Sequence, residues 1–122
     1  MASVAIHRTE ALGNRDHADW LVATKPNDPI ALRWAVTATF YCALHAISAH
    51  LVSRQIYVQR HDDRSVAMDD PAAGIPIDIR DAYDYLKRRS VGARYQSRAF
   101  IAREVRHAID NQLAQILKFV GV

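Results

Sequence analysis

The chain has 122 residues, of which 50% are hydrophobic and 24% charged, and its net charge is +3. This is the composition of an ordinary globular protein, so it excludes a disordered chain, and the length suits one domain covering residues 1–122. The only cysteine, Cys42, excludes an internal disulfide and any zinc site or redox pair built from cysteines. The N-terminus lacks the basic head and long apolar stretch of a secretory signal, and we expect a cytoplasmic protein.

Arginine outnumbers lysine by 13 to 3, and the basic side chains gather in the C-terminal half of the chain. Arginine suits phosphate binding and base stacking better than lysine does. A genome rich in G and C produces the same excess, because it favours arginine codons everywhere. The arginine content alone therefore does not establish nucleic-acid binding.

The chain shows helical spacing in every long segment and no useful stretch of alternating β-branched residues, which predicts an all-α fold. A first helix is expected over residues 10–23, with a start obscured by Gly13. It would present four apolar side chains to a partner helix: Leu12, Trp20, Leu21 and Val22. Asp28 and Pro29 then have the residue types of an N-cap and a first helical position, and the helix that they start can run to about residue 54.

Three further helices are expected after this long one. A short helix at residues 62–68 precedes a loop at 70–76 that contains two prolines and a glycine. A helix at residues 77–90 follows, with Gly92 suited to ending it. The last helix, at residues 97–120, carries an apolar stripe of Ile101, Val105, Ile109, Leu113, Ile116 and Val120. Short connections predict an antiparallel up-and-down bundle of four to five helices around the long central one.

Residues 34–53 contain no Lys, Arg, Asp or Glu. Such a run is long enough to span a membrane, but it holds several polar residues and no basic cluster flanks it, so we expect no membrane insertion. As a helix it has a seam of small side chains, Ala35, Thr39, Cys42, Ala46, Ala49 and Ser53. Beside the seam runs a bulky ridge of Val36, Phe40, Ala43, Ile47 and Leu51. The pattern predicts the central helix of the bundle, surrounded by other helices. A dimer interface could cover part of it.

A third, half-polar stripe of this helix consists of Trp34, Thr37, Tyr41, His45, Ser48 and Val52. We interpret His45 as a partly buried histidine bonded to a side chain or a carbonyl, and His50 as a residue that favours the helix dipole when protonated. Neither histidine has a Glu or His at metal-ligating spacing. No metal and no cofactor are expected.

Four segments, in order, resemble small bacterial proteins of the HEPN superfamily, the higher-eukaryote and prokaryote nucleotide-binding helical domains. They are WAVTATFYCALHAISAHL (34–51), HDDR (61–64), YDYL (83–86) and SVGARY (90–95). The resemblance implies an antiparallel bundle that often dimerises. Many members are metal-independent ribonucleases of toxin–antitoxin, phage-defence or RNA-processing systems. These use an arginine, usually followed by a polar residue, and a histidine, with about four to six residues between the two.

Arg54, followed by Gln55 and separated from His61 by six residues, matches that spacing. The resemblance implies that His61 transfers a proton and that Arg54, or else Arg64, holds the phosphate while charge builds. Active members usually carry this motif near the last main helices, whereas Arg54 and His61 lie at the end of the central helix.

We also expect the end of the long helix and the turn at residues 90–97 to gather His61, Arg64, Arg94 and Tyr95 into a surface that binds a phosphate and stacks a base. In the alternative, Arg64 pairs with an aspartate such as Asp62 or Asp63, Arg94 caps a neighbouring helix, and Tyr95 packs inward. The sequence leaves both arrangements open.

The expected function is that of a homodimeric HEPN-like protein that binds or cleaves RNA, with metal-independent endoribonuclease activity as the catalytic form. The alternative is a non-catalytic helical module that dimerises and binds a partner protein, such as a nucleotidyltransferase antitoxin.

Overall fold

The chain folds into an all-α bundle in the computed structural model, which describes residues 2–58 and 60–122 and, at positions 61 and 62, the backbone alone. Its helices are α1 (Val4–Thr24), α2 (Pro29–Ser53), α3 (His61–Asp69), α4 (Ile77–Tyr95), α5 (Ala102–Ala108) and α6 (Ala114–Val120). A 3₁₀ turn, η1 (Pro71–Ala73), precedes α4, and a π-helical turn, η2 (Ile109–Leu113), joins α5 to α6 into one continuous helix.

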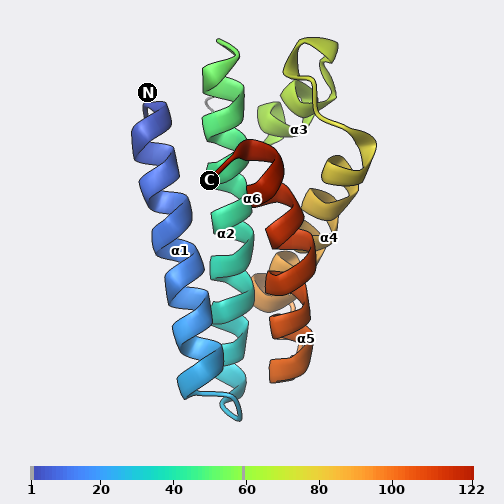
Figure 1. Ribbon diagram of the computed structural model, residues 1–122. Coiled ribbons are helices and arrows are strands. Elements are labelled where there is room, and N and C mark those ends of the chain that lie inside the picture. The colour runs from blue at the N-terminus through green and yellow to red at the C-terminus, as the bar shows by residue number, and fades with distance from the viewer. Residues whose placement is uncertain (1, 59) are drawn as a thin grey trace.

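The long helices run alternately down and up the bundle (Figure 1). α1 descends, a short turn leads into the ascending α2, α4 descends, and α5, η2 and α6 ascend together, while the short α3 lies at the upper end. This arrangement confirms the predicted class, an antiparallel helical bundle with a long central helix.

The predicted start of α2 is correct. Asp28 is its N-cap, and its carboxylate accepts hydrogen bonds from the backbone N–H groups of Ile30 and Ala31 at 3.0 and 3.2 Å, with Pro29 at the first helical position. At the other end Gln55 adopts a left-handed backbone with φ 62°, and the N–H of Ile56 donates to the carbonyl of Leu51 at 2.9 Å. This is the helix ending in which glycine usually stands.

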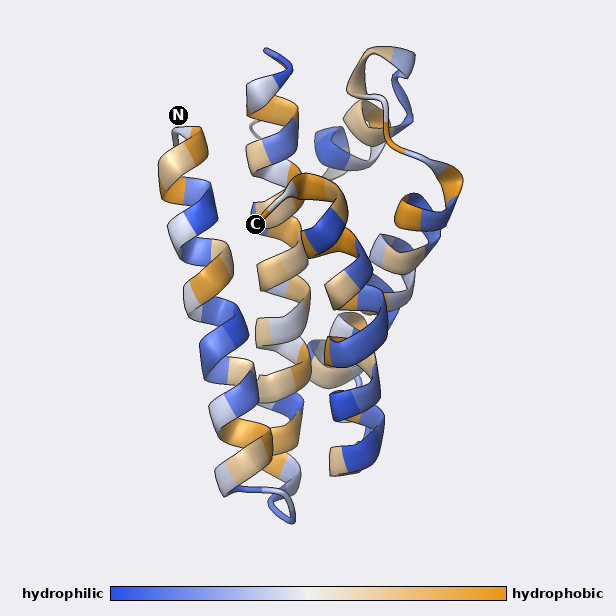
Figure 2. Ribbon diagram, in the orientation of Figure 1, coloured by the Kyte–Doolittle hydropathy of each residue, from blue (hydrophilic) through white to orange (hydrophobic). Residues whose placement is uncertain are grey.

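α2 occupies the centre of the bundle because it packs against α1 on one side and against α4, α5 and α6 on others. The small-residue seam is buried up to Ala49, as is the whole bulky ridge. Burial raises the pKa of Cys42 to about 12, so this thiol is an inert core group. α2 is long and apolar enough to cross a membrane, but 78% of its most apolar stretch is buried by the rest of the protein. In Figure 2 it is hydrophobic along most of its length, whereas α1 is largely hydrophilic.

α1 differs from the prediction at its start and in its packing face. It begins two turns early, where the Ser3 hydroxyl accepts a hydrogen bond from the N–H of Ile6 at 3.2 Å, and Gly13 lies exposed inside the helix. The prediction that Trp20 packs against a partner helix is wrong. Its ring is 54% exposed and stacks on His17 instead.

The predicted turn at residues 90–97 is also wrong, because α4 continues to Tyr95 with Gly92 buried inside it. Gly92 is small for a packing reason. A Cβ on this residue would lie 3.3 Å from Cδ of Arg98, whose side chain crosses over it. The chain reverses later, at Ser97, which adopts a left-handed backbone with φ 51°. The last helix therefore begins at Ala102 and leaves Ile101 exposed.

The π-helical turn shifts the buried face of the last helix by part of a turn, because it adds a residue to one turn of the helix. The predicted stripe is buried at Val105, Ile109, Leu113 and Ile116. Beyond η2 the buried residues are Ile116 and its neighbour Leu117, and Val120 is only partly covered.

Candidate functional site

A pocket of about 490 Å³ opens between the first half of α2 and the end of α4. We call it the α2–α4 pocket, and its lining consists of Ile30, Arg33, Trp34, Thr37, Tyr41, Ala93 and Arg94. Its volume lies in the range of small-molecule binding sites. Two arginines and two aromatic rings line it, and no carboxylate is among these lining residues. The lining therefore favours an anionic ligand that has a flat ring.

The guanidinium of Arg94 stands among three aromatic rings at the end of α4. Its centre is 4.9 Å from the ring of Tyr95, 5.6 Å from that of Tyr41 and 5.8 Å from that of Phe40. Its Nη1 donates to the hydroxyl of Tyr41 at 3.2 Å and to that of Tyr95 at 3.4 Å, and its Nε donates to the Ser90 carbonyl at 3.4 Å. Cation–π contacts and neutral acceptors thus orient Arg94 without neutralising its charge.

Two of the rings near Arg94 are open to solvent. Trp34 is 61% exposed and Tyr95 is 73% exposed, while Tyr41 is partly buried and Phe40 lies in the core. Large exposed aromatic side chains next to fixed cations are typical of surfaces that stack bases. In the predicted alternative Arg94 caps a neighbouring helix and Tyr95 packs inward. The structure shows neither. Arg94 donates to a carbonyl of its own helix and to the Tyr41 side chain in the middle of α2, and Tyr95 is exposed to solvent.

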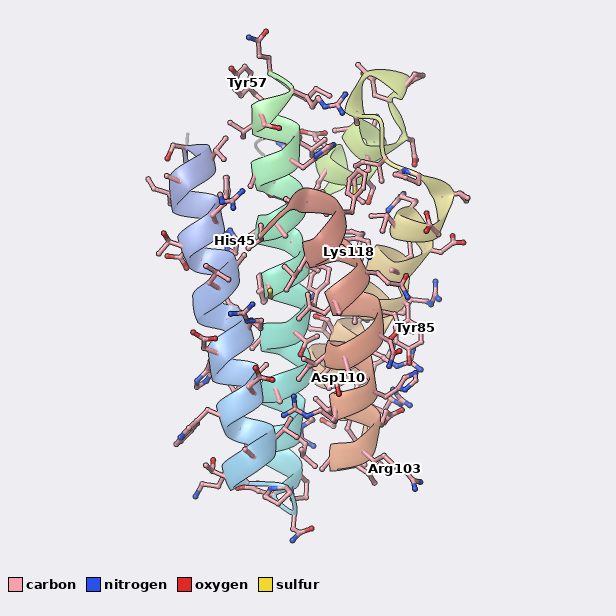
Figure 3. The ribbon with its side chains drawn as sticks, viewed as in Figure 1. His45, Tyr57, Tyr85, Arg103, Asp110 and Lys118 are labelled. Carbon is pink, nitrogen blue, oxygen red and sulfur yellow. The ribbon has the colours of Figure 1, made fainter. Side chains whose placement is uncertain are left out.

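A pair of histidines lies one turn further along α2. His45 faces α1, where its Nδ1 is 3.0 Å from Nδ1 of His7, and both side chains are half-buried. Figure 3 shows His45 in the space between α1 and α2. The interpretation of His45 as a partly buried histidine bonded to a side chain is confirmed. Burial lowers the pKa of both histidines, and the positive charge of Arg64 lowers it further.

Arg64 extends from α3 towards the same stripe of α2. Its Nε donates to the Ser48 hydroxyl at 3.1 Å, and its positive charge acts on the buried Tyr83 of α4. The pKa of Tyr83 is raised by its burial, against the charges of Arg64 and Arg80. Pairing of Arg64 with Asp62 concerns a side chain outside the described part of the chain.

The predicted catalytic residues lie at the end of α2 and the start of α3. Arg54 is the exposed C-cap residue of α2, and its guanidinium lies against Gly74, where a Cβ would come within 3.2 Å of Nη1. His61 is the first residue of α3, and its side chain lies outside the described part of the chain. The pairing of Arg54 with His61 stays a prediction.

The predicted gathering of Arg64 and Arg94 is only partial. Their partners on α2, Ser48 and Tyr41, are seven residues apart. Seven residues correspond to two helical turns, about 10 Å along the axis. Both arginines therefore contact the same stripe of α2 about two turns apart, and the gathering of all four predicted residues into one phosphate site stays a prediction.

Sequence reasoning missed three functional candidates, two on this face of α2 and one on α1. Trp34 and Tyr41 belong to the half-polar stripe, whose spacing already placed them on one side of the helix. What the spacing does not show is that Arg94 lies opposite them. His7 had no signal in the sequence, because its role depends on a contact with a residue 38 positions away.

Within the part of the chain that the structure describes, no three His, Cys, Asp or Glu side chains lie together as a metal site requires. No family model, no curated protein and no solved structure matches the chain. Its class therefore rests on the fold and the site themselves: an all-α bundle with an arginine–aromatic pocket on its central helix.

Proposed function

We propose that this chain is a HEPN-like protein that binds single-stranded RNA through the α2–α4 pocket. The observation that carries the proposal is the position of Arg94 among Tyr41, Tyr95 and Phe40, beside the exposed ring of Trp34. Proteins that bind single strands combine aromatic stacking platforms with a positively charged groove. Trp34 and Tyr95 supply the platforms, and Arg33 and Arg94 supply the charge.

A single strand fits this site better than a duplex, because stacking on Trp34 or Tyr95 needs a base whose face is free. Bases in unpaired loops and ends offer that face, whereas bases inside a helix are already stacked. The sequence pI of 9.3 adds a general attraction for the phosphate backbone. The affinity from stacking on the aromatic rings depends less on salt concentration than the affinity from the arginine–phosphate contacts does.

Binding is tested by fluorescence anisotropy of a short labelled single-stranded RNA. Replacing Arg94 with Gln removes the charge and keeps a polar side chain, and we expect affinity to fall about tenfold or more, as for loss of a charge-assisted hydrogen bond. The matched control is Arg103→Gln. Arg103 is exposed at the start of α5 and projects away from the bundle (Figure 3). Equal affinity of the two variants would refute the placement of RNA in this pocket.

The assignment of Arg54 and His61 extends the proposal from binding to cleavage. In that reaction His61 takes the proton of a 2′-hydroxyl, the 2′-oxygen attacks the adjacent phosphorus, and the bond from phosphorus to the 5′-oxygen breaks. Water protonates the leaving oxygen, and Arg54 holds the charge on the phosphate. The assay is cleavage of varied RNAs in EDTA by wild type, His61→Ala and Arg54→Ala. If the wild type leaves them intact, the protein binds RNA without cutting it.

The alternative function, a dimerising module for a partner protein, rests on the same face of α2. Ile30 and Trp34 expose 59% and 61% of their surface there, side by side in the pocket lining. A homodimer or an antitoxin-like partner would cover them. Sedimentation of wild type and Trp34→Glu distinguishes the alternatives. A dimer that the substitution dissociates, with no RNA binding by wild type, would favour the interaction module.

A further inference from the structure

The contact between His7 and His45 determines which ring nitrogens carry a proton. Their Nδ1 atoms are 3.0 Å apart and their ring centroids 5.3 Å apart. Because a hydrogen bond needs one N–H and one lone pair, one ring donates from Nδ1 and the other accepts there. When both rings are neutral, the accepting ring carries its proton on Nε2 and the donating ring has a bare Nε2.

One added proton changes what the pair offers to a ligand. Protonation of the donating ring gives both rings an N–H at Nε2 and leaves the Nδ1–Nδ1 hydrogen bond intact. A second proton would place an N–H on both Nδ1 atoms and break that bond. The pair therefore accommodates one proton, and in that state it presents two N–H donors and one positive charge.

In the absence of a bound anion, burial and nearby positive charge disfavour this protonation. Burial is the largest effect that lowers the pKa of each ring. The positive charge of Arg64 on α3 acts in the same direction on both rings, and His7 does so on His45. Glu10 of α1 acts in the opposite direction on both rings, but it does not outweigh burial. An anion in contact with the pair would add to the effect of Glu10 and favour the protonated form.

The pair also lies where a bound strand would continue beyond the α2–α4 pocket. His45 follows Tyr41 by four residues, one turn along the same helix, and side chains at this spacing have Cβ atoms about 5–6 Å apart. Tyr41 is the last residue of α2 in the pocket lining, so the pocket ends there along this helix. A phosphate next to the nucleotide in the pocket therefore falls near His45.

We propose that His7 and His45, together with the charge of Arg64, form a second phosphate subsite for the RNA, and that a phosphate there binds with uptake of one proton. The inference rests on the proposed RNA-binding function and adds to it a subsite and its regulation. It makes affinity depend on pH. Above the pKa of the RNA-bound pair affinity is constant. Below that pKa affinity rises as pH falls, and it levels off below the lower pKa of the free pair.

The test is RNA affinity of the full chain between about pH 8 and about pH 5.5, a range that spans the titration of histidine. The probe is a short single-stranded RNA with a pH-insensitive dye. We expect the wild type to bind more tightly at low pH, with log affinity rising by as much as about one unit per pH unit for one proton. In the double variant His7→Gln/His45→Gln, whose amides keep a hydrogen bond between α1 and α2, this rise should be lost.

The matched control is His17→Gln, which removes an exposed histidine of α1 that stacks on Trp20. It should keep the wild-type pH profile. If wild type and the double variant bind RNA with the same pH profile, the subsite is refuted and the proposed function stands. If the wild type binds no RNA at any pH, the proposed function fails and the subsite fails with it.

Discussion

Replacing Trp34 with Ala removes the largest exposed ring of the α2–α4 pocket. Trp34 is 61% exposed, so the substitution opens no core cavity, and we expect the free energy of unfolding to change by no more than about 0.5 kcal/mol. Stacking of one base on an aromatic ring contributes about 1–3 kcal/mol to binding. The affinity for single-stranded RNA should therefore fall by a factor between about 5 and about 150.

The chain offers a matched control in its other tryptophan. Trp20 is 54% exposed on α1 and is not among the residues that line the pocket. Trp20→Ala loses the same ring at nearly the same exposure, and it should bind RNA as the wild type does. In Trp20→Phe the remaining indole is Trp34, since the chain has two tryptophans, and its fluorescence should be quenched as RNA binds. Equal affinity of Trp34→Ala and wild type, or no quenching in Trp20→Phe, would refute the stacking role.

Two further predictions concern stability. Gln55→Gly should raise the free energy of unfolding by about 0.5–1 kcal/mol. A left-handed backbone costs residues other than glycine about 1–2 kcal/mol, and glycine removes this strain. Part of the gain is offset because glycine also increases the conformational entropy of the unfolded chain. Urea denaturation measures it, and Gln55→Val should have the opposite sign. The second prediction is that stability falls as pH drops below about 6.5. The half-buried His7 and His45 have lowered pKa values in the folded chain, so the unfolded chain binds protons that the folded chain does not. Denaturation curves at several pH values should show this for the wild type, and a double variant His7→Gln/His45→Gln with an equally steep decline would contradict the assignment.

The bounds of α2 could be predicted because local chemistry determines them. Asp28 and Pro29 specify the start through hydrogen bonds and a backbone angle that need no tertiary contact. Burial of α2 follows from the absence of charge on most of its circumference. These features depend on neighbouring residues in the chain, and periodicity reports them directly.

The end of α4 could not be predicted, because Gly92 has two readings. A glycine at that position suits a helix end, and it equally suits a close approach by another side chain. The structure selects the second reading through Arg98, which lies over Gly92 after the chain has reversed. The two residues meet because the chain reverses at Ser97, where the Arg98 N–H donates to the Gly92 carbonyl at 3.1 Å, and serine is not a residue type that indicates a left-handed backbone.

The candidate site follows the same division. Arg94 and Tyr95 were predicted as nucleic-acid-binding residues. The structure places Arg94 in the pocket lining with Tyr41, which the stripe of α2 already contained, and Tyr95 in contact with Arg94. The partner of His45 is on another helix, and no spacing within α2 indicates it. A single sequence does not determine which side chains on different helices contact each other.

The burial of α2 means that folding is what covers the most apolar segment of this chain. In the unfolded state α2 is a continuous stretch of the length and hydropathy that cross a lipid bilayer, and the other helices hide 78% of its most apolar part. During synthesis α1 and α2 emerge before α4, α5 and α6 exist to cover them. For that interval the nascent chain presents an apolar helix to chaperones and membranes alike, and completion of the last helix ends this exposure.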